Sequence, residues 1–202
     1  MWARLRHGAA LHQTAITTAP DRYPALFAAL AARLPADARI LSFGCSTGEE
    51  LISLRRLMPE ARLTGVEINP HARATAIART TIDQRIEVVP TLPKGVFDAV
   101  LALAVLQREP HRVDDEAWTD LSRHYSFARF DDAVTELAER LAPGGLLAVH
   151  HAQYRVEDSA VAALLTPVAD TPLQSPPLFD RNSRRYDPAP PSASLFVKRA
   201  RR

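Results

Sequence analysis

Apolar side chains recur along the chain with two kinds of spacing. Between Asp21 and Pro35 the apolar residues return every three or four positions, and Asp21 is placed to cap a helix that ends near Pro35. Shorter runs are almost entirely apolar and are bounded by glycine, proline or polar residues, which is typical of buried strands. The predicted strands are residues 40–43, 61–70, 85–90, 96–106, 146–151 and 194–199.

Segments with helical character separate most of these predicted strands. Helices are expected over residues 49–58, 71–80 and 157–165. A further helix is expected to be capped by Asp131 or Asp132 and ended by Pro143-Gly144-Gly145. Strands that alternate with helices through most of a chain predict a doubly wound α/β fold with a mostly parallel sheet.

Composition narrows the class of protein. At 202 residues and 47% hydrophobic content, the chain suits one domain. We divide it into an N-terminal lid and helix, residues 1–35, and a ligand-binding domain, residues 36–202. A net charge of +2 with well-mixed acids and bases does not favour nucleic acid as a partner. No apolar run approaches the roughly 18 residues of a membrane span. Cys45 is the only cysteine, so we expect no internal disulfide and a cytoplasmic protein.

The segment ILSFGCSTGEE, residues 40–50, is the most informative stretch of the sequence. An apolar strand runs into a turn bounded by Gly44 and Gly48, and a helix follows. A strand that feeds a glycine turn at a helix N-terminus is a ligand site in open α/β sheets. Because the turn brings Glu49 and Glu50 instead of a lysine, it favours a nucleoside ligand without phosphates, such as S-adenosylmethionine. An ordinary βα turn is the alternative interpretation.

Glu67 lies about twenty residues beyond the turn, at the end of the second predicted strand. A carboxylate at that place can accept hydrogen bonds from both hydroxyls of a ribose. Dinucleotide enzymes use the same device, so Glu67 indicates a nucleoside without identifying it. The turn has Ser46 where a GxGxxG motif places its second glycine, and this disfavours NAD.

Three features together resemble the class I S-adenosylmethionine-dependent methyltransferases. They are ILSFGCSTG, LTGVEIN and LAPGGLLAV, which follow the order and spacing of that family across roughly residues 36–155. The form GCSTGEE is similar to the glycine loop of the chemotaxis receptor methyltransferases, although we find no counterpart of their receptor-binding β-subdomain. The resemblance implies a single-domain Rossmann-like fold with a seven-stranded sheet and S-adenosyl-L-methionine as the cofactor.

The resemblance also implies roles for individual residues. The glycine turn would take the methionine part of the cofactor, and Arg22 would meet its carboxylate. Glu67 would hold the ribose. Ile68 and Leu92 would enclose the adenine, and Leu103 would offer its backbone to the amino group.

One position departs from the family pattern. Many relatives carry an Asp or Asn after the third strand to contact the adenine, where this chain has Thr91, so Thr91 or a backbone group must take that contact. The full set of predicted cofactor-binding residues is Arg22, Gly44, Cys45, Ser46, Thr47, Gly48, Glu67, Ile68, Asn69, Thr91, Leu92 and Leu103.

His150 and His151 end the fifth predicted strand and are the candidate catalytic residues, since a histidine there can act as a general base. Adjacent residues on a strand point to opposite faces, so we do not expect the pair to share a metal ion, and we predict no metal site. Cys45 is either a reactive thiol at a helix N-terminus or a small buried residue under the loop, and we favour the second.

Two irregular segments, residues 1–20 and 107–130, are expected near the ligand. The first is either disordered or a lid. The aromatic residues that suggest a pocket for a small substrate are His12, Tyr23, Trp118 and Tyr125. The sequence thus predicts methyl transfer from S-adenosylmethionine to an unidentified acceptor, more in keeping with a small molecule than a protein or nucleic acid. A non-catalytic S-adenosylmethionine-binding domain and an NAD(P)-dependent oxidoreductase are the alternatives.

Overall fold

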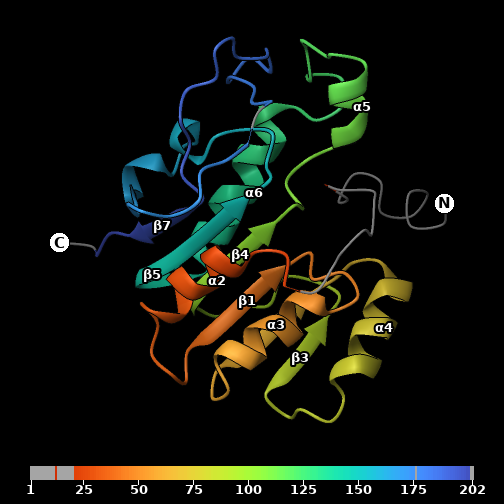
Figure 1. The fold of residues 1–202 in the computed structure, drawn as a ribbon, viewed down its shortest axis with the longest axis vertical. Helices are drawn as coiled ribbons and strands as arrows, with labels where there is room; N and C mark the ends of the chain where they lie inside the picture. The colour runs from red at the N-terminus through yellow and green to blue at the C-terminus, as the bar shows by residue number, and fades with distance from the viewer. Residues whose placement is uncertain (1–11, 13–20, 176, 201–202) are drawn as a thin grey trace.

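One mixed sheet of seven strands organises the computed structural model, which describes residues 12, 21–175 and 177–200. The strands are β1 Arg39–Phe43, β2 Arg62–Val66, β3 Ile86–Val89, β4 Phe97–Leu103, β5 Leu141–His150, β6 Leu165–Pro167 and β7 Leu195–Lys198. They lie in the order β3-β2-β1-β4-β5-β7-β6 (Figure 1). β1 to β5 are parallel, and β7 runs antiparallel to β5 and β6. The predicted doubly wound fold is confirmed.

Helices flank both faces of this sheet (Figure 1). Those in the described residues are α2 Pro24–Ala31, α3 Glu49–Leu57, α4 Pro70–Thr80, α5 Pro110–Asp115 and α6 Phe127–Glu139, with 3-10 turns at Val156–Asp158 and Ala162–Leu164. None of them is long and apolar enough to cross a membrane.

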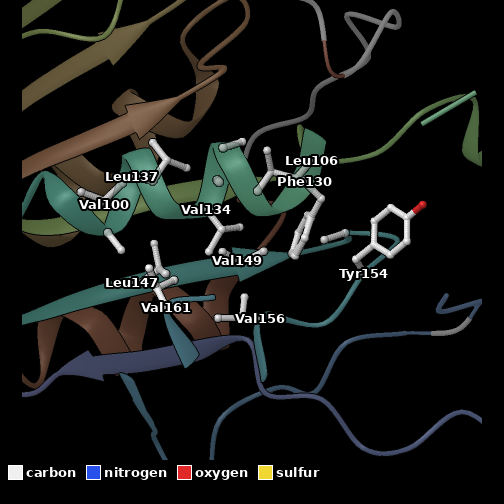
Figure 2. Close-up of a cluster of buried hydrophobic side chains, with 14 of the residues drawn as sticks. Val100, Leu106, Phe130, Val134, Leu137, Leu147, Val149, Tyr154, Val156 and Val161 are labelled. Carbon is white, nitrogen blue, oxygen red and sulfur yellow. The ribbon is translucent and has the colours of Figure 1, made fainter. Parts of the chain in front are cut away.

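A separate hydrophobic cluster fills each face of the sheet. On one face, α2 and α3 bury Leu26, Leu30 and Leu54 against β1 and β4. On the other, α6 lies along β5 and buries Phe130 and Val134 (Figure 2). Each helix turns one apolar side toward the sheet, which is the usual source of helix stability in a layered fold.

The strand order reverses beside β1. From β1 the chain moves outward through β2 and β3, and it then returns to β4 on the other side of β1. Every residue of β4 except Asp98 is buried, as predicted for a central strand. The Asp98 carboxylate accepts a hydrogen bond from the Arg39 amide at 2.8 Å, so Asp98 is structural. The carboxyl ends of β1 and β4 form the switch point where ligands bind in such sheets.

Two predicted helix caps are wrong. Asp21 precedes the start of α2, whose N-cap is Tyr23, and its carboxylate pairs instead with Arg56 of α3 at 3.2 Å. Helix α6 begins at Phe127, earlier than a cap at Asp131 or Asp132 allows. The Phe127 amide donates to the Ser183 hydroxyl at 3.1 Å, so a residue distant in sequence accepts a hydrogen bond from the first turn of the helix.

Two further predictions in the second half of the chain are wrong. Pro143-Gly144-Gly145 does not end a helix, because α6 already ends at Glu139 and these residues lie inside β5. The strand bulges there, and its register with β4 shifts. The helix expected over 157–165 is replaced by the two 3-10 turns and β6. The short helix α5 was not predicted.

Candidate functional site

Gly44 begins the turn after β1 and requires a glycine for two reasons. Its φ of 77° lies in the left-handed region. A Cβ at this position would lie 2.5 Å from Val105 Cγ2, in the segment that follows β4. The amides of Gly44 and Cys45 both donate to the Val66 carbonyl, at 2.8 and 3.1 Å. The turn is therefore held between the ends of β2 and β4.

Gly48 ends the turn and caps α3 with a φ of 91°. A Cβ there would lie 3.3 Å from Ala76 of α4. Next to it, the Thr47 hydroxyl donates to the Glu49 carboxylate, which also pairs with Arg79 of α4. Burial acts to raise the pKa of Glu49, but the hydrogen bonds from Thr47 and Arg79 bring it below its ordinary value. Glu49 therefore stays ionised and anchors the turn to α4.

Glu67 closes the turn from the end of β2. Its Oε2 accepts a hydrogen bond from the Ser46 amide at 3.0 Å, and its Oε1 accepts one from the Asn69 amide at 2.7 Å. The residue is only 8% exposed. Burial raises the pKa of Glu67, and the two amide bonds oppose that rise. The structure thus brings three of the predicted site residues into direct contact, with the carboxylate at the carboxyl edge of the sheet.

The other predicted residues lie farther along this edge. Ile68 is half-buried, and its carbonyl accepts a hydrogen bond from Arg73 at 3.3 Å. Leu92 packs against the hydrophobic cluster on the α6 face, whereas Thr91 is exposed. Leu103 ends β4 and is 7% exposed. Their contacts with a ligand stay predictions.

Cys45 lies under the turn as a small buried residue, which confirms the favoured interpretation. Burial raises the pKa of its thiol, and the nearby Glu67 and Glu50 charges raise it further. Gly65 of β2 makes room for it, because a Cβ at Gly65 would lie 2.7 Å from the Cys45 sulfur. A thiol in this setting is not a nucleophile.

His150 and His151 lie beside each other, contrary to the expectation that they point to opposite faces. Their ring centroids are 4.3 Å apart, and both rings contact Tyr23, at 5.5 and 5.7 Å between centroids. The cause is the backbone: His151 follows the end of β5 and has a φ of 51°. No group of three metal-binding side chains occurs in the described part of the chain.

We use the name Tyr23 cluster for Tyr23, Ser42, Glu50, His150 and His151. Two of its polar atoms are buried without a hydrogen-bond partner among the described residues: Tyr23 Oη and Glu50 Oε1. Burial raises the pKa of Glu50, the Ser42 hydroxyl and the Arg22 charge oppose that rise, and the resulting pKa is about 7. Buried polar atoms without partners are rare in folded proteins, and they indicate that another molecule can satisfy them.

The histidines of this cluster are neutral at neutral pH. Burial is the largest cause that lowers the pKa of His150 to about 4, and His151 and Arg22 act in the same direction. Burial also lowers the pKa of His151. His150 Nδ1 lies 2.6 Å from the Ser194 hydroxyl, which fixes its ring, whereas His151 is half-buried.

A second aromatic group, the His12 cluster, consists of His12, Phe43 and Tyr125. His12 Nδ1 lies 2.8 Å from Tyr125 Oη, and the His12 ring contacts the Phe43 ring edge-on at 6.0 Å between centroids. The Arg129 guanidinium of α6 lies 5.6 Å from the centroid of the Tyr125 ring. Burial, followed by the charges of Arg129 and Arg108, lowers the pKa of His12 to about 4.

The four aromatic residues expected to form one pocket are divided. Tyr23 belongs to the hydrophobic cluster on the α2 face and Tyr125 to the cluster on the α6 face. Trp118 stacks on His124 at 4.0 Å between centroids and packs against the cluster on the α6 face. Apart from His12, the predicted lid over residues 1–20 lies outside the described residues.

Sequence reasoning missed the parts of the site that depend on tertiary contacts. The sequence presents Glu50 only as part of a charged helix start, although its burial makes it the distinctive carboxylate of the Tyr23 cluster. It predicts Val105 as part of a strand, whereas Val105 follows β4 and forms the wall against Gly44. A signal did exist for Gly65, because an isolated glycine in a strand indicates close approach of another group.

A profile of the methyltransferase domain family matches residues 15–183 of the chain. No curated protein matches. Among solved structures, the N-methyltransferase NodS from Bradyrhizobium japonicum WM9 is similar in fold, with a TM-score of 0.56 and 17% identity. That match covers 87% of this chain and 93% of NodS.

Two other solved structures match a smaller part of the chain. The amino pentose methyltransferase CalS10 from Micromonospora echinaspora is 26% identical, with a TM-score of 0.44, over 65% of this chain and 50% of that one. The [4+2]-cyclase SpnF is 24% identical, with a TM-score of 0.45, over 61% of this chain and 43% of that one. The chain therefore spans half or less of the length of these two proteins.

Proposed function

The chain belongs to the methyltransferase domain family, and from this premise we propose that it transfers a methyl group from S-adenosylmethionine to a small-molecule acceptor. The observation that carries the proposal is the turn from Gly44 to Gly48, closed by the buried Glu67 carboxylate at the switch point of the sheet. When bound, the cofactor supplies a methyl group that is already activated on a sulfonium sulfur. The protein's tasks are then alignment and exclusion of water.

Glu67 is proposed to hold the ribose. Each of its carboxylate oxygens accepts one hydrogen bond from a backbone amide, that of Ser46 or Asn69, and has a further lone pair. Those lone pairs suit two ribose hydroxyls. Ile68 and Leu92, both half-buried at the same edge, are proposed to flank the adenine, with Thr91 beside it. Cys45 contributes its backbone, since its side chain is buried under the turn.

The Tyr23 cluster is proposed to hold the amino acid end of the cofactor. That end carries one ammonium and one carboxylate group. Glu50 offers a buried carboxylate to the ammonium group, and Arg22 offers a guanidinium to the carboxylate. The Tyr23 hydroxyl gives a further donor without a partner among the described residues. These residues therefore suit a zwitterion. Leu103, whose backbone is expected to meet the amino group, ends the adjoining strand β4.

His150 and His151 are proposed as the groups that handle a proton when the acceptor atom carries one. Both are neutral, because burial lowers their pKa values, and a neutral imidazole can accept a proton. His151 is the more accessible of the two. The Ser194 hydroxyl lies 2.6 Å from His150 Nδ1 and holds the His150 ring beside His151.

Calorimetric titration of the full chain with S-adenosylhomocysteine, NAD and NADP tests the proposal. We expect saturable binding of S-adenosylhomocysteine and none of the dinucleotides. Binding of a dinucleotide alone would overturn the proposal in favour of an oxidoreductase. If S-adenosylhomocysteine binds but no acceptor in a broad panel receives a labelled methyl group, the chain is a binding domain without catalysis.

A further inference from the structure

The corner between β2 and α4, residues 67–73, is held together by hydrogen bonds among its own residues. The Glu67 carboxylate accepts a hydrogen bond from the Asn69 amide at 2.7 Å. The Asn69 side chain in turn caps α4 by accepting hydrogen bonds from two amides near the start of the helix. Arg73 completes the corner, because its side chain reaches back from α4 to the end of β2.

The Arg73 guanidinium bonds to the backbone of this corner. Its Nη1 donates to the Glu67 carbonyl at 2.9 Å and to the Ile68 carbonyl at 3.3 Å. Both carbonyls lie beyond the last residue pair of the β2–β3 ladder, Val66 with Val89, and a carbonyl that is not fully solvated still requires a donor. Arg73 therefore fixes the backbone at the point where the strand ladder stops.

The place of Arg73 on α4 does not favour a cation on electrostatic grounds. Arg73 is the fourth residue of the helix and is half-buried, close to the N-terminus where the helix dipole disfavours positive charge. The two carbonyls and the nearby Glu67 charge offset this cost. Arg73 thus serves the end of β2 rather than the helix that carries it.

We propose that Arg73 is a positioning residue of the cofactor site, which fixes the backbone of Glu67 and Ile68 and thereby aims the Glu67 carboxylate at the ribose. The inference rests on the proposed function and adds a residue that acts through Glu67. A rotation of the peptide between Glu67 and Ile68 would turn the carboxylate away from two hydroxyls at once. A binding group is effective only when its neighbours hold it in the productive geometry.

Electrostatics support the same role. Burial raises the pKa of Glu67, and the Asn69 amide, the Ser46 amide and the Arg73 charge oppose that rise. The Cys45 thiol beneath the turn adds no charge, because burial raises its pKa. Arg73 therefore favours the ionised carboxylate, which is the form that accepts two hydroxyls. Without Arg73 the pKa of Glu67 is higher, so the ionised form is lost at a higher pH as the pH falls.

Calorimetric titration of the full chain with S-adenosylhomocysteine at pH 8 tests the inference. Arg73→Met keeps a side chain of similar shape without a donor, and we expect about fivefold weaker binding. Arg73→Lys retains the charge and should lose less. Arg62→Met, at the exposed amino end of β2, is the matched control and should change the affinity less than about twofold. If Arg73→Met binds as the control does, the inference is overturned.

The pH dependence of the affinity separates positioning from a general loss of structure. We expect the ratio of the Kd of Arg73→Met to that of the unmodified chain to be about twofold larger at pH 5.5 than at pH 8. Arg73→Lys should show nearly the same ratio at both values. Glu50 also titrates in this range, but it does so in every variant, so the ratio removes its contribution. A ratio for Arg73→Met that stays constant with pH would contradict action on the Glu67 carboxylate.

A double-mutant cycle identifies the residue through which Arg73 acts. In a Glu67→Ala background, Arg73→Met should weaken the binding of S-adenosylhomocysteine less than about twofold, because the carboxylate that it positions is gone. An equal loss in both backgrounds would overturn the inference. Circular dichroism checks that each variant is folded. Arg73→Gln, which keeps a donor without the charge, replaces Arg73→Met if that variant unfolds.

The same titrations separate the failure of this inference from the failure of the proposed function. If the unmodified chain does not bind S-adenosylhomocysteine, the function itself fails. If the unmodified chain binds it and Arg73→Met matches the Arg62→Met control, the inference fails and the methyltransferase function stands.

Discussion

The Tyr23 cluster and the His12 cluster each place a tyrosine beside a histidine, on opposite faces of the sheet. They differ in how their polar atoms are satisfied. Tyr125 Oη lies 2.8 Å from His12 Nδ1, whereas Tyr23 Oη has no hydrogen-bond partner among the described residues. The first tyrosine completes a contact within the protein. The second leaves a buried hydroxyl for a ligand, a cost that proteins accept at functional sites.

The two clusters also differ in charge. The Tyr23 cluster faces both signs, through Glu50 and Arg22, while the charges of Arg108 and Arg129 both lower the pKa of His12. A site with both signs suits a zwitterion. The difference is the basis for assigning the amino acid end of the cofactor to the Tyr23 cluster.

The largest expected effect comes from the turn that lies between the clusters. Gly44→Ala introduces a Cβ 2.5 Å from Val105 at a φ of 77°. We expect the free energy of unfolding to fall by about 2–5 kcal/mol, from left-handed strain and overpacking together. Denaturant unfolding monitored by circular dichroism measures it.

Gly144→Ala is the matched control for that change. Gly144 has a φ of 79°, and a Cβ there would have no atom within 4 Å. Its free energy of unfolding should therefore fall only by the cost of the left-handed backbone, about 1–2 kcal/mol. Equal losses for the two alanine variants would show that contact between the turn and the segment after β4 does not matter.

Glu50→Gln should change how stability depends on pH. The pKa of Glu50 is raised to about 7 in the folded protein, so the folded state loses stability as the pH rises from about 4.5 to 7. The glutamine variant avoids this loss. We expect it to be more stable than the unmodified chain at pH 8, by at most about 3 kcal/mol, and nearly equal to it at pH 4.

Glu49→Gln, at the position next to Glu50, should change stability at pH 8 in the opposite direction. The pKa of Glu49 is lowered in the folded protein, so its contribution is present above its ordinary pKa and is lost as the pH falls. We expect the variant to be less stable at pH 8 by about 1 kcal/mol. If both glutamine variants shift stability in the same direction at pH 8, the assignment of Glu50 as the destabilising buried carboxylate is wrong.

The smallest effects come from removing one hydroxyl from each cluster. Tyr125→Phe loses the hydrogen bond with His12 and should cost about 1 kcal/mol of unfolding free energy. Tyr23→Phe removes a hydroxyl without a partner among the described residues, so its stability should be unchanged or slightly higher. Its affinity for S-adenosylhomocysteine should fall by a few-fold, as the proposed ligand contact is lost. A stability loss in Tyr23→Phe as large as in Tyr125→Phe would remove the distinction between the clusters.

The sequence predicted the first half of the fold closely because its signals are local. The β1 turn, the strand ends and the helices α3 and α4 follow from glycine positions and apolar spacing within about a dozen residues. In the second half the determining contacts are distant. The Ser183 hydroxyl accepts a hydrogen bond from the Phe127 amide at the start of α6. The Tyr154 hydroxyl donates to the Tyr125 carbonyl and lies 2.8 Å from the Ser183 hydroxyl. Local capping rules cannot indicate such partners.

The candidate site divides in the same way. The turn and Glu67 could be predicted, because a glycine turn and an acid after the next strand form a recognisable pattern. The burial of Glu50, the approach of Val105 and the contact between His150 and His151 arise from tertiary packing and from one left-handed residue. None of these leaves a trace in the order of residues.

The central claim is that Glu67 and the glycine turn hold S-adenosylmethionine, and the affinity of Glu67→Ala for S-adenosylhomocysteine tests it most directly. Glu67→Gln checks that the turn survives, because the carbonyl oxygen of the glutamine can still accept a hydrogen bond from a backbone amide. Glu87→Ala, an exposed acid on β3, is the control. Loss of two charge-assisted bonds at about 1.5–3 kcal/mol each predicts at least a tenfold weaker affinity for Glu67→Ala by calorimetry, with the control unchanged. Unchanged affinity in Glu67→Ala would contradict the claim.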